Sequence, residues 1–117
     1  MRWVLRSKLH NASVTEANVD YVGSISIDKE LIDRCGFWVG ERVQVVSNTS
    51  GARLTTYVIE APFGSRSICM NGAAAHLIKE GEQIIVMGFE LVTDQITPRI
   101  VLVDHNNAFL ENLGAGH

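Results

Sequence analysis

Short segments in which apolar and polar residues alternate, separated by turn signals, limit what this chain can fold into more than any other feature. Segment 42–46 alternates valines with polar residues, and segment 53–61 resumes an apolar pattern after the polar stretch 47–51. A period of two is typical of half-buried β-strands, because successive side chains of a strand point to opposite faces. The two segments and the turn between them predict a β-hairpin.

Further strands are predicted on both sides of this hairpin. Segments 2–9 and 12–16 indicate two short strands that join near Asn11, and segments 83–92 and 98–103 are strongly apolar. No internal repeat, linker or low-complexity stretch divides the chain. Many short strands with little helix favour one compact β-barrel domain spanning residues 1–117.

Helix signals are few. Asp28 is a candidate N-cap, acidic residues follow it in the early turns, and Gly36 offers a C-terminal stop, so a short helix is predicted between them. The Asn71-Gly72 step permits a sharp turn, and the alanines after it allow a single helical turn or a close approach of backbones. Residues 106–117 are polar and contain glycine, which predicts a loose tail or a packing arm.

Composition excludes several classes of function. Acidic residues (13) outnumber basic ones (10) among the 117 residues, so binding along nucleic acid is not expected. Arg2, Arg6 and Lys8 form a basic cluster that either meets a small anion or is solvated. Cys35 and Cys69 form no CxxC pair, which indicates reduced thiols and a cytoplasmic location. The apolar stretches are too short for a signal peptide or a spanning helix, so no membrane partner is expected.

Motifs of common catalytic sites are missing. The four histidines, His10, His76, His105 and His117, show neither mutual ligand spacing nor a suitably spaced carboxylate, so no metal site is predicted. The chain has no Gly-rich phosphate loop and no Gly-x-Ser-x-Gly elbow, which leaves nucleotide chemistry and classical hydrolysis without support.

The Gly23-Ser24 step is the remaining focus. A glycine permits a tight connection in which the serine hydroxyl approaches the preceding carbonyl carbon, although a turn with a solvent-facing serine is the alternative. Other polar or small residues accompany it along the chain, and each taken alone also suits a surface, core or turn position. These candidates are Lys8, His10, Tyr21, Arg53, Thr56, Tyr57, Asn71, Gly72, Ala73 and Ala74.

In this order, the candidate segments resemble the pyruvoyl-dependent aspartate 1-decarboxylases. The set is specific although each segment alone is weak, and it extends from the start of the chain to about Val103. The matching segments are Ser7-Lys8-Leu9-His10, Tyr21-Val22-Gly23-Ser24, Gly51-Ala52-Arg53-Leu54-Thr55-Thr56-Tyr57, Gly64-Ser65-Arg66 and Asn71-Gly72-Ala73-Ala74-Ala75-His76.

The resemblance implies a mainly β fold, a six-stranded double-psi β-barrel with short helices, assembled as a homotetramer with sites at subunit interfaces. It also implies self-cleavage between Gly23 and Ser24, which yields a beta chain of residues 1–23 and an alpha chain of residues 24–117. The Ser24 hydroxyl would attack the Gly23 carbonyl, and elimination and hydrolysis would convert Ser24 into a covalent pyruvoyl cofactor. No metal is implied.

The implied reaction is decarboxylation of L-aspartate to β-alanine and CO2, in pantothenate and coenzyme A synthesis. Thr56 would donate to the Gly23 oxygen during cleavage, and Tyr57 would return a proton to the decarboxylated carbon. Arg53 would hold the carboxylate that stays, with Lys8 adding a positive charge. In a regular strand Thr56 and Tyr57 face opposite sides, so either a bulge or service of two sites at one interface is expected.

Other residues have supporting roles in the resemblance. His10 would shape the substrate pocket, Tyr21 would lie close to the cleavage site, and Asn71, Gly72, Ala73 and Ala74 would border the cofactor.

The chain departs from the family pattern at Val22, where an acidic residue is expected, at Ser7, where glycine is usual, and in the turn 47–50. Two alternatives therefore stay open: a decarboxylase of another acidic amino acid on the same scaffold, and a non-catalytic β-barrel binding module.

Overall fold

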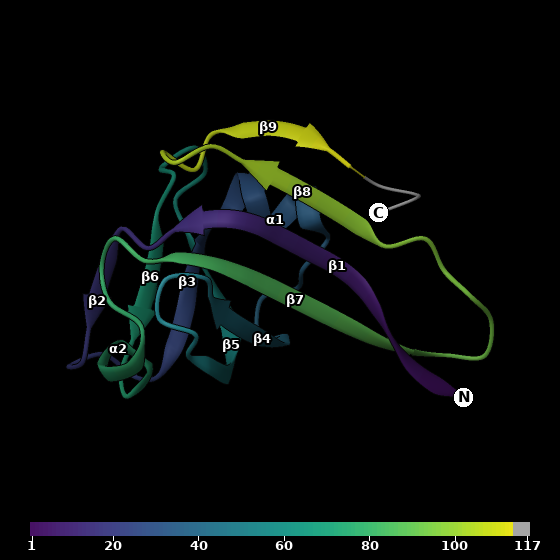
Figure 1. Ribbon diagram of the computed structural model, residues 1–117, viewed down its shortest axis with the longest axis horizontal. Coiled ribbons are helices and arrows are strands. Elements are labelled where there is room, and N and C mark those ends of the chain that lie inside the picture. The colour runs from purple at the N-terminus through teal and green to yellow at the C-terminus, as the bar shows by residue number, and fades with distance from the viewer. Residues whose placement is uncertain (114–117) are drawn as a thin grey trace.

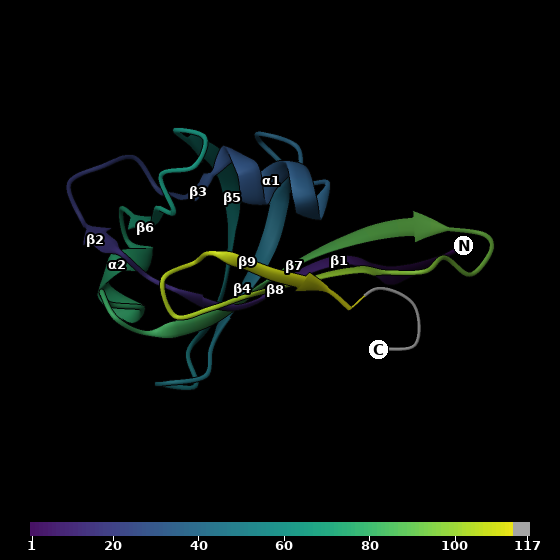
Figure 2. The same cartoon turned by 90° about the horizontal axis from the view of Figure 1, so that it is seen from above.

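Nine strands form one sheet in the computed structural model, which describes residues 1–113 (Figures 1 and 2). The described residues are therefore mainly β with few short helices, as predicted, although nine strands are present where six were expected. The elements are β1 (Arg2–Ser13), β2 (Glu16–Asn18), β3 (Ser24–Asp28), α1 (Lys29–Cys35), β4 (Arg42–Ser47), β5 (Arg53–Ala61), β6 (Ile68–Asn71), α2 (Ala74–Leu77), β7 (Gln83–Val92), β8 (Arg99–Val103) and β9 (Phe109–Asn112).

The sheet curls around its core. Its strand order is β2-β6-β3-β5-β4-β7-β1-β8-β9, so β1 and β2 lie far apart in the order although they are adjacent in the chain. The link between them is held at both sides: Val14 N donates to Glu82 O at 2.9 Å, and Thr15 N donates to Ile68 O at 2.8 Å. The short link thus brings the β6 side of the sheet close to the β7 side.

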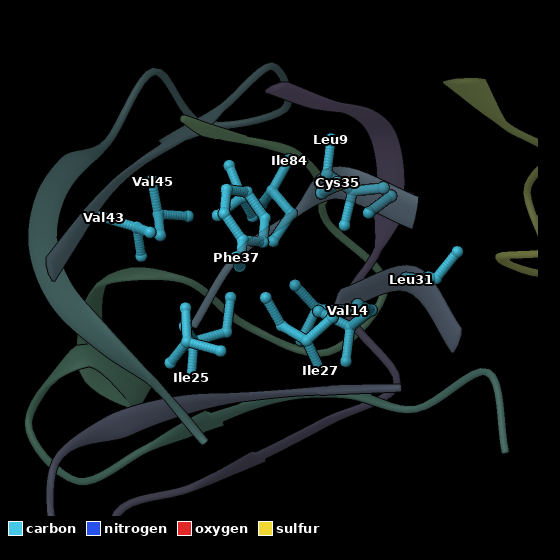
Figure 3. Packing of buried hydrophobic residues seen from close by; sticks show 14 of the residues in the cluster. Leu9, Val14, Ile25, Ile27, Leu31, Cys35, Phe37, Val43, Val45 and Ile84 are labelled. Carbon is cyan, nitrogen blue, oxygen red and sulfur yellow. The ribbon is translucent and has the colours of Figure 1, made fainter. Parts of the chain in front are cut away.

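Apolar side chains fill the inside of this curled sheet (Figure 3). In β4, for example, Val43 and Val45 are buried, whereas Arg42, the first residue of the strand, is exposed and Gln44 is half-buried, which is the alternation read from the sequence. The predicted hairpin is confirmed, because β4 pairs antiparallel with β5. The side chains labelled in Figure 3 include Leu9, Val14, Ile25, Ile27, Leu31, Cys35, Phe37, Val43, Val45 and Ile84.

The N-terminal segment is one strand, so the prediction of two strands joined near Asn11 is wrong. β1 pairs with β7 on both sides of a register shift between Leu9 and Ala12. Asn11 adopts a φ of 66° inside this irregularity, a left-handed conformation that asparagine tolerates better than most residues. The polar residue that suggested a turn therefore marks a bulge within a continuous strand.

The predicted helix after Asp28 is confirmed, and of the two alternatives for the alanines after Gly72 the structure has the single helical turn. The Asp28 carboxylate accepts a hydrogen bond from Glu30 N at 2.9 Å at the start of α1. Gly36 ends this helix with a φ of 75°, and its N–H donates to Ile32 O. α2 is a single turn built on the alanines that follow Gly72.

The C-terminal segment is a packing arm as far as residue 113. β9 pairs antiparallel with β8, and the Arg34 guanidinium lies 3.7 Å from the centroid of the Phe109 ring. Residues 114–117 of the predicted tail lie outside the described residues. Among residues 1–113, no helix is long and apolar enough to cross a membrane.

One end of the molecule extends as a narrow arm. The first half of β1 and the second half of β7 pair from Arg2↔Val92 to Leu5↔Phe89 and project away from the curled part of the sheet (Figure 1). The molecule is accordingly elongated, with extents of 41 × 28 × 25 Å. Trp3 (63% exposed) and Phe89 (38% exposed) leave this arm with apolar surface in contact with solvent.

Candidate active site

The Gly23-Ser24 bond lies where β3 begins, beside the end of β6. Ser24 is the antiparallel partner of Asn71, and its side chain is buried, with 2% of the residue exposed. The alternative of a turn with a solvent-facing serine is therefore wrong. The loop before it differs in character, because Tyr21 and Val22 are largely exposed.

Both hydrogen-bonding functions of the Ser24 hydroxyl are occupied. Asn71 Nδ2 donates to Ser24 Oγ at 2.9 Å, and Ser24 Oγ donates to Val22 O at 3.3 Å. The oxygen is consequently held at the start of the strand, and the carbonyl that it bonds is that of Val22, one residue before the Gly23 carbonyl.

Gly72 lies directly against the backbone before Ser24. It has a φ of 70°, and a Cβ atom at this position would lie 2.7 Å from Gly23 Cα and 2.9 Å from Tyr21 O. Distances below 3.0 Å to backbone atoms leave no room for a side chain. The family resemblance implies that Gly72 borders the cofactor, and the structure adds a steric reason for glycine at this position.

Two adjoining hollows meet at this bond, and they share Tyr57 and Asn71. Their volumes are about 400 Å³ and about 350 Å³. Together they bring eight of the candidate residues into one region. The first is lined by Gly23, Leu54, Thr55, Thr56, Tyr57, Asn71, Ala73, Ala74 and Leu77, and the second by Tyr21, Val22, Ser24, Ser26, Tyr57, Ile59 and Asn71.

Thr56 and Tyr57 line the same hollow without a bulge. The pairing of β5 with β4 runs in continuous register from Arg53↔Val46 to Tyr57↔Arg42, so the expected bulge is absent from this stretch. Pairing of β5 with β3 starts only at Val58. Thr56 and Tyr57 therefore lie just before the paired part of β3 and β5. The edge of β5 that faces β3 is unpaired there, so side chains from both faces of β5 can line the hollow.

Lys8, His10 and Arg53 line neither hollow. Lys8 and His10 share one face of β1, as predicted, because both are half-buried and flank the fully buried Leu9. Arg53 donates to Gln44 Oε1 at 2.9 Å. Within one copy of the chain, the candidate residues therefore lie in two separate regions.

Lys8 and Arg53 lie on the same outer face of the sheet. Lys8 pairs with Met87, and Met87 pairs with Gln44, the hydrogen-bond partner of Arg53. Burial, with the positive charge of Lys8 as a smaller cause, lowers the pKa of His10, so its neutral form is favoured. Within residues 1–113 its Nδ1 atom is buried and has no hydrogen-bond partner.

Sequence reasoning missed two residues beside the Ser24 hydroxyl. Asn71 Nδ2 also donates to Ser26 Oγ at 2.9 Å, and Cys69 Sγ donates to Asn71 Oδ1 at 3.0 Å. Burial and the neighbouring Glu16 carboxylate raise the pKa of Cys69 to about 11, which keeps the thiol protonated near neutral pH. The signal was present in the sequence, since Ser26 and Cys69 each lie two residues from a candidate on the same strand.

The arrangement suits attack by an oxygen nucleophile on a neighbouring amide. A buried serine oxygen is held next to a peptide whose glycine packs on a second glycine, and hydroxyl, phenol and amide donors line the adjoining space. Among residues 1–113, no group of three or more potential ligand side chains is placed to hold a metal ion.

Known proteins match this chain over almost its full length. The sequence model of the aspartate decarboxylase family matches residues 1–110. An aspartate 1-decarboxylase of Bacillus cereus (strain G9842) is 48% identical over 118 residues, covering 97% of this chain and 93% of the relative. Aspartate 1-decarboxylases of Bacillus thuringiensis (strain Al Hakam) and Bacillus velezensis (strain DSM 23117) are 46% and 44% identical, covering 97% of this chain and 93% and 92% of the relatives. With this agreement over almost the whole length of the sequence, the chain belongs to the aspartate decarboxylase family.

Proposed function

We propose that this chain is a self-processing, pyruvoyl-dependent decarboxylase that converts L-aspartate into β-alanine and CO2 for pantothenate and coenzyme A synthesis. The name shared by its relatives supports the reaction and the substrate. The single observation that carries the self-processing is the buried Ser24 hydroxyl, held by Asn71 beside the Gly23 peptide. The cytoplasm is the proposed location.

Cleavage would begin with attack of Ser24 Oγ on the carbonyl carbon of Gly23. The C–N bond then breaks, giving an ester between Gly23 and the Ser24 side chain and a free amine on Ser24. Removal of the Ser24 α-proton breaks the Cβ–Oγ bond, so residues 1–23 leave with a C-terminal carboxylate and position 24 becomes dehydroalanine. Water then replaces the amine, which leaves as ammonia, and the pyruvoyl group remains at the start of residues 24–117.

Thr56 is the proposed donor to the Gly23 oxygen as negative charge develops on it. Both residues line the first hollow, which supports this role. A single donor of this kind lowers the barrier by about 3 kcal/mol.

The residues around position 24 fit a small ketone derived from Ser24. Asn71 already donates to the side-chain oxygen of that position, and the small side chains of Ala73 and Ala74 line the adjoining hollow. The pyruvoyl group would supply a carbonyl that condenses with the substrate amine and accepts the electrons released with CO2. Tyr57, which lines both hollows, is the proposed source of the proton that replaces the carboxylate.

Substrate binding would use two copies of the chain. Arg53 lies four residues from Tyr57 along β5, a strand length of about 13 Å, and its side chain lines neither hollow but donates to Gln44. We infer that the Lys8, His10 and Arg53 region of one copy completes the Gly23-Ser24 region of another, with Arg53 holding the carboxylate that stays. The exposed Trp3, Trp38 and Phe89 side chains support assembly, and a homotetramer is the proposed state.

For the finer fold, we propose that six of the nine strands form a double-psi β-barrel. The mixture of parallel and antiparallel pairs around β3 and β1 supports this assignment.

The experiment that tests the proposed reaction is CO2 release from aspartate, glutamate and substituted aspartates by the purified protein and by Ser24→Ala. Aspartate is expected to be the preferred substrate, and Ser24→Ala is expected to release none. Decarboxylation by Ser24→Ala would overturn the mechanism, preference for another amino acid would overturn the substrate, and no decarboxylation at all would favour a binding module.

A further inference from the structure

We propose that Cys69 is a positioning residue for self-cleavage: its thiol fixes the orientation of the Asn71 amide, so that the amide NH2 group faces the Ser24 oxygen. The proposal rests on the proposed self-processing at Gly23-Ser24 and adds a residue that acts through Asn71.

Strand pairing brings the necessary side chains onto one face. In the β3·β6 ladder, Ser24 is the partner of Asn71 and Ser26 is the partner of Cys69. Residues two apart on a strand point to the same side, so the four side chains form a compact square. Three of its members, Ser24, Cys69 and Asn71, are buried, with at most 7% of each residue exposed.

Every polar atom of the Asn71 amide has a partner inside this square. Its Nδ2 atom donates to Ser24 Oγ and Ser26 Oγ, both at 2.9 Å, and its Oδ1 atom accepts from Cys69 Sγ at 3.0 Å. A primary amide has two N–H donors, so the two hydroxyls use both of them.

The thiol is the group that distinguishes the two ends of the amide. A hydroxyl can donate or accept, so Ser26 would also satisfy an amide turned by 180°, and Ser24 could do so by giving up its longer hydrogen bond to Val22 O at 3.3 Å. A protonated thiol donates its hydrogen but accepts only weakly, which favours the amide oxygen on the Cys69 side. Glu16 Oε2 is a second acceptor for the same thiol, at the longer distance of 3.5 Å.

The orientation matters most when the Cβ–Oγ bond breaks. At that step Ser24 Oγ becomes an oxygen of the departing Gly23 carboxylate and gains negative charge. The hydrogen bond from an N–H donor to this oxygen is stronger in the transition state than in the ester, so it accelerates elimination. A turned amide would present its own oxygen to the developing charge and slow the same step.

The test compares cleavage rates of full-length precursors of the wild-type chain, Cys69→Ala and Cys69→Ser, followed by intact mass. Cys69→Ala is expected to cleave about fivefold more slowly, the rate equivalent of one buried neutral hydrogen bond. Cys69→Ser keeps a donor but can also accept from a turned amide, so it is expected to recover only part of the rate. Cys35→Ala is the matched control, because it also removes a buried thiol but lies in the core cluster away from the Asn71 network.

Hydroxylamine, which cleaves esters, identifies the slowed step. The proposal predicts that Cys69→Ala accumulates the hydroxylamine-sensitive ester, whereas a general loss of packing would slow cleavage without that accumulation. If Cys69→Ala lowers the melting temperature more than Cys35→Ala does, Cys69→Val is measured in its place, because valine fills the space of the thiol without restoring a donor. The same cleavage rate and ester accumulation are then compared with wild type.

The possible outcomes separate the two proposals. Wild-type protein that never cleaves would contradict self-processing itself. Wild-type cleavage with an equal rate in Cys69→Ala, or slow cleavage in Cys69→Ala without ester accumulation, would overturn the positioning role of Cys69 and leave self-processing intact.

Discussion

The backbone of Gly72 touches the backbone of Gly23, and this contact sets the position of the bond proposed to cleave. Gly72→Ala would place a Cβ atom 2.7 Å from Gly23 Cα and 2.8 Å from Gly23 N. We expect self-cleavage to slow by at least about tenfold, since small displacements of reacting groups have effects of that size or larger. The rate is measured from the appearance of the 1–23 fragment.

A substitution at a second glycine, Gly51, distinguishes the effect of this contact on cleavage from the effect of backbone strain. Gly51 has a φ of 79° and no atom within 4 Å of the position of its missing Cβ. Gly51→Ala should lower stability by about 1 kcal/mol through its left-handed backbone alone, with normal cleavage. Equal cleavage rates in the Gly72 and Gly51 variants would show that the Gly72 contact does not position the bond.

Among the secondary structure elements, α1 and the loop before β6 are joined by one carboxylate. Buried Asp28 accepts hydrogen bonds from Glu30 N, Gly64 N and Arg66 N at 2.8–2.9 Å. Asp28→Ala leaves these three donors without that acceptor, and we expect it to lower the free energy of unfolding by about 3 kcal/mol. Asp33→Ala, which removes an exposed ion pair with Lys29 in the same helix, should cost about 0.5 kcal/mol or less in urea unfolding. Similar values for the two variants would contradict the bridging role of Asp28.

The turn between β4 and β5 is tied to the loop before β7 by Glu82. Ser47 Oγ donates to Glu82 Oε1 at 2.6 Å and Lys79 N donates to Oε2 at 2.7 Å; these bonds lower the pKa of Glu82 from its ordinary value of 4.5. A lowered pKa in the folded state stabilises the fold above pH 4.5, and this stability is lost as pH falls through the folded-state pKa. Thermal unfolding of Glu82→Gln should therefore differ most from wild type near neutral pH, and the difference should shrink in acid. Glu80→Gln, at an exposed neighbour, should show no such trend, and a pH-independent effect of Glu82→Gln would contradict this role of Glu82.

At the level of the whole molecule, the separation of Arg53 from the Ser24 region predicts complementation between copies. Arg53→Ala and Ser24→Ala should each lack activity towards aspartate. Refolding the two variants together should restore part of it, because some sites would combine Ser24 of one copy with Arg53 of another. Activity is measured as CO2 release after mixed refolding, with each variant refolded alone as the control. No recovery in mixed oligomers would indicate that each copy binds substrate with its own Arg53.

The periodic patterns predicted β4, β5, β7 and β8, because alternation reports burial directly: β7 has the predicted bounds, and α1 begins after its predicted cap. The short strands β2 and β9 were not predicted. Asn11 misled the reading of β1, since the same residue type suits a turn and a bulge. Although sites at subunit interfaces were expected, the sequence could not predict which candidate residues lie in which region, because the strand order that separates Lys8 from Ser24 depends on pairing between distant segments. Ser26 and Cys69 were missed because each appears as an ordinary strand residue until Asn71 connects them.

The conversion of Ser24 into a chain end is the central claim, and the intact mass of the purified protein under denaturing conditions tests it most directly. The account predicts two chains, residues 1–23 ending in a carboxylate and residues 24–117 beginning with a pyruvoyl group. Ser24→Ala should give one chain of 117 residues in the same assembly state. A wild-type protein that decarboxylates aspartate while its mass remains that of the uncleaved chain would contradict the account.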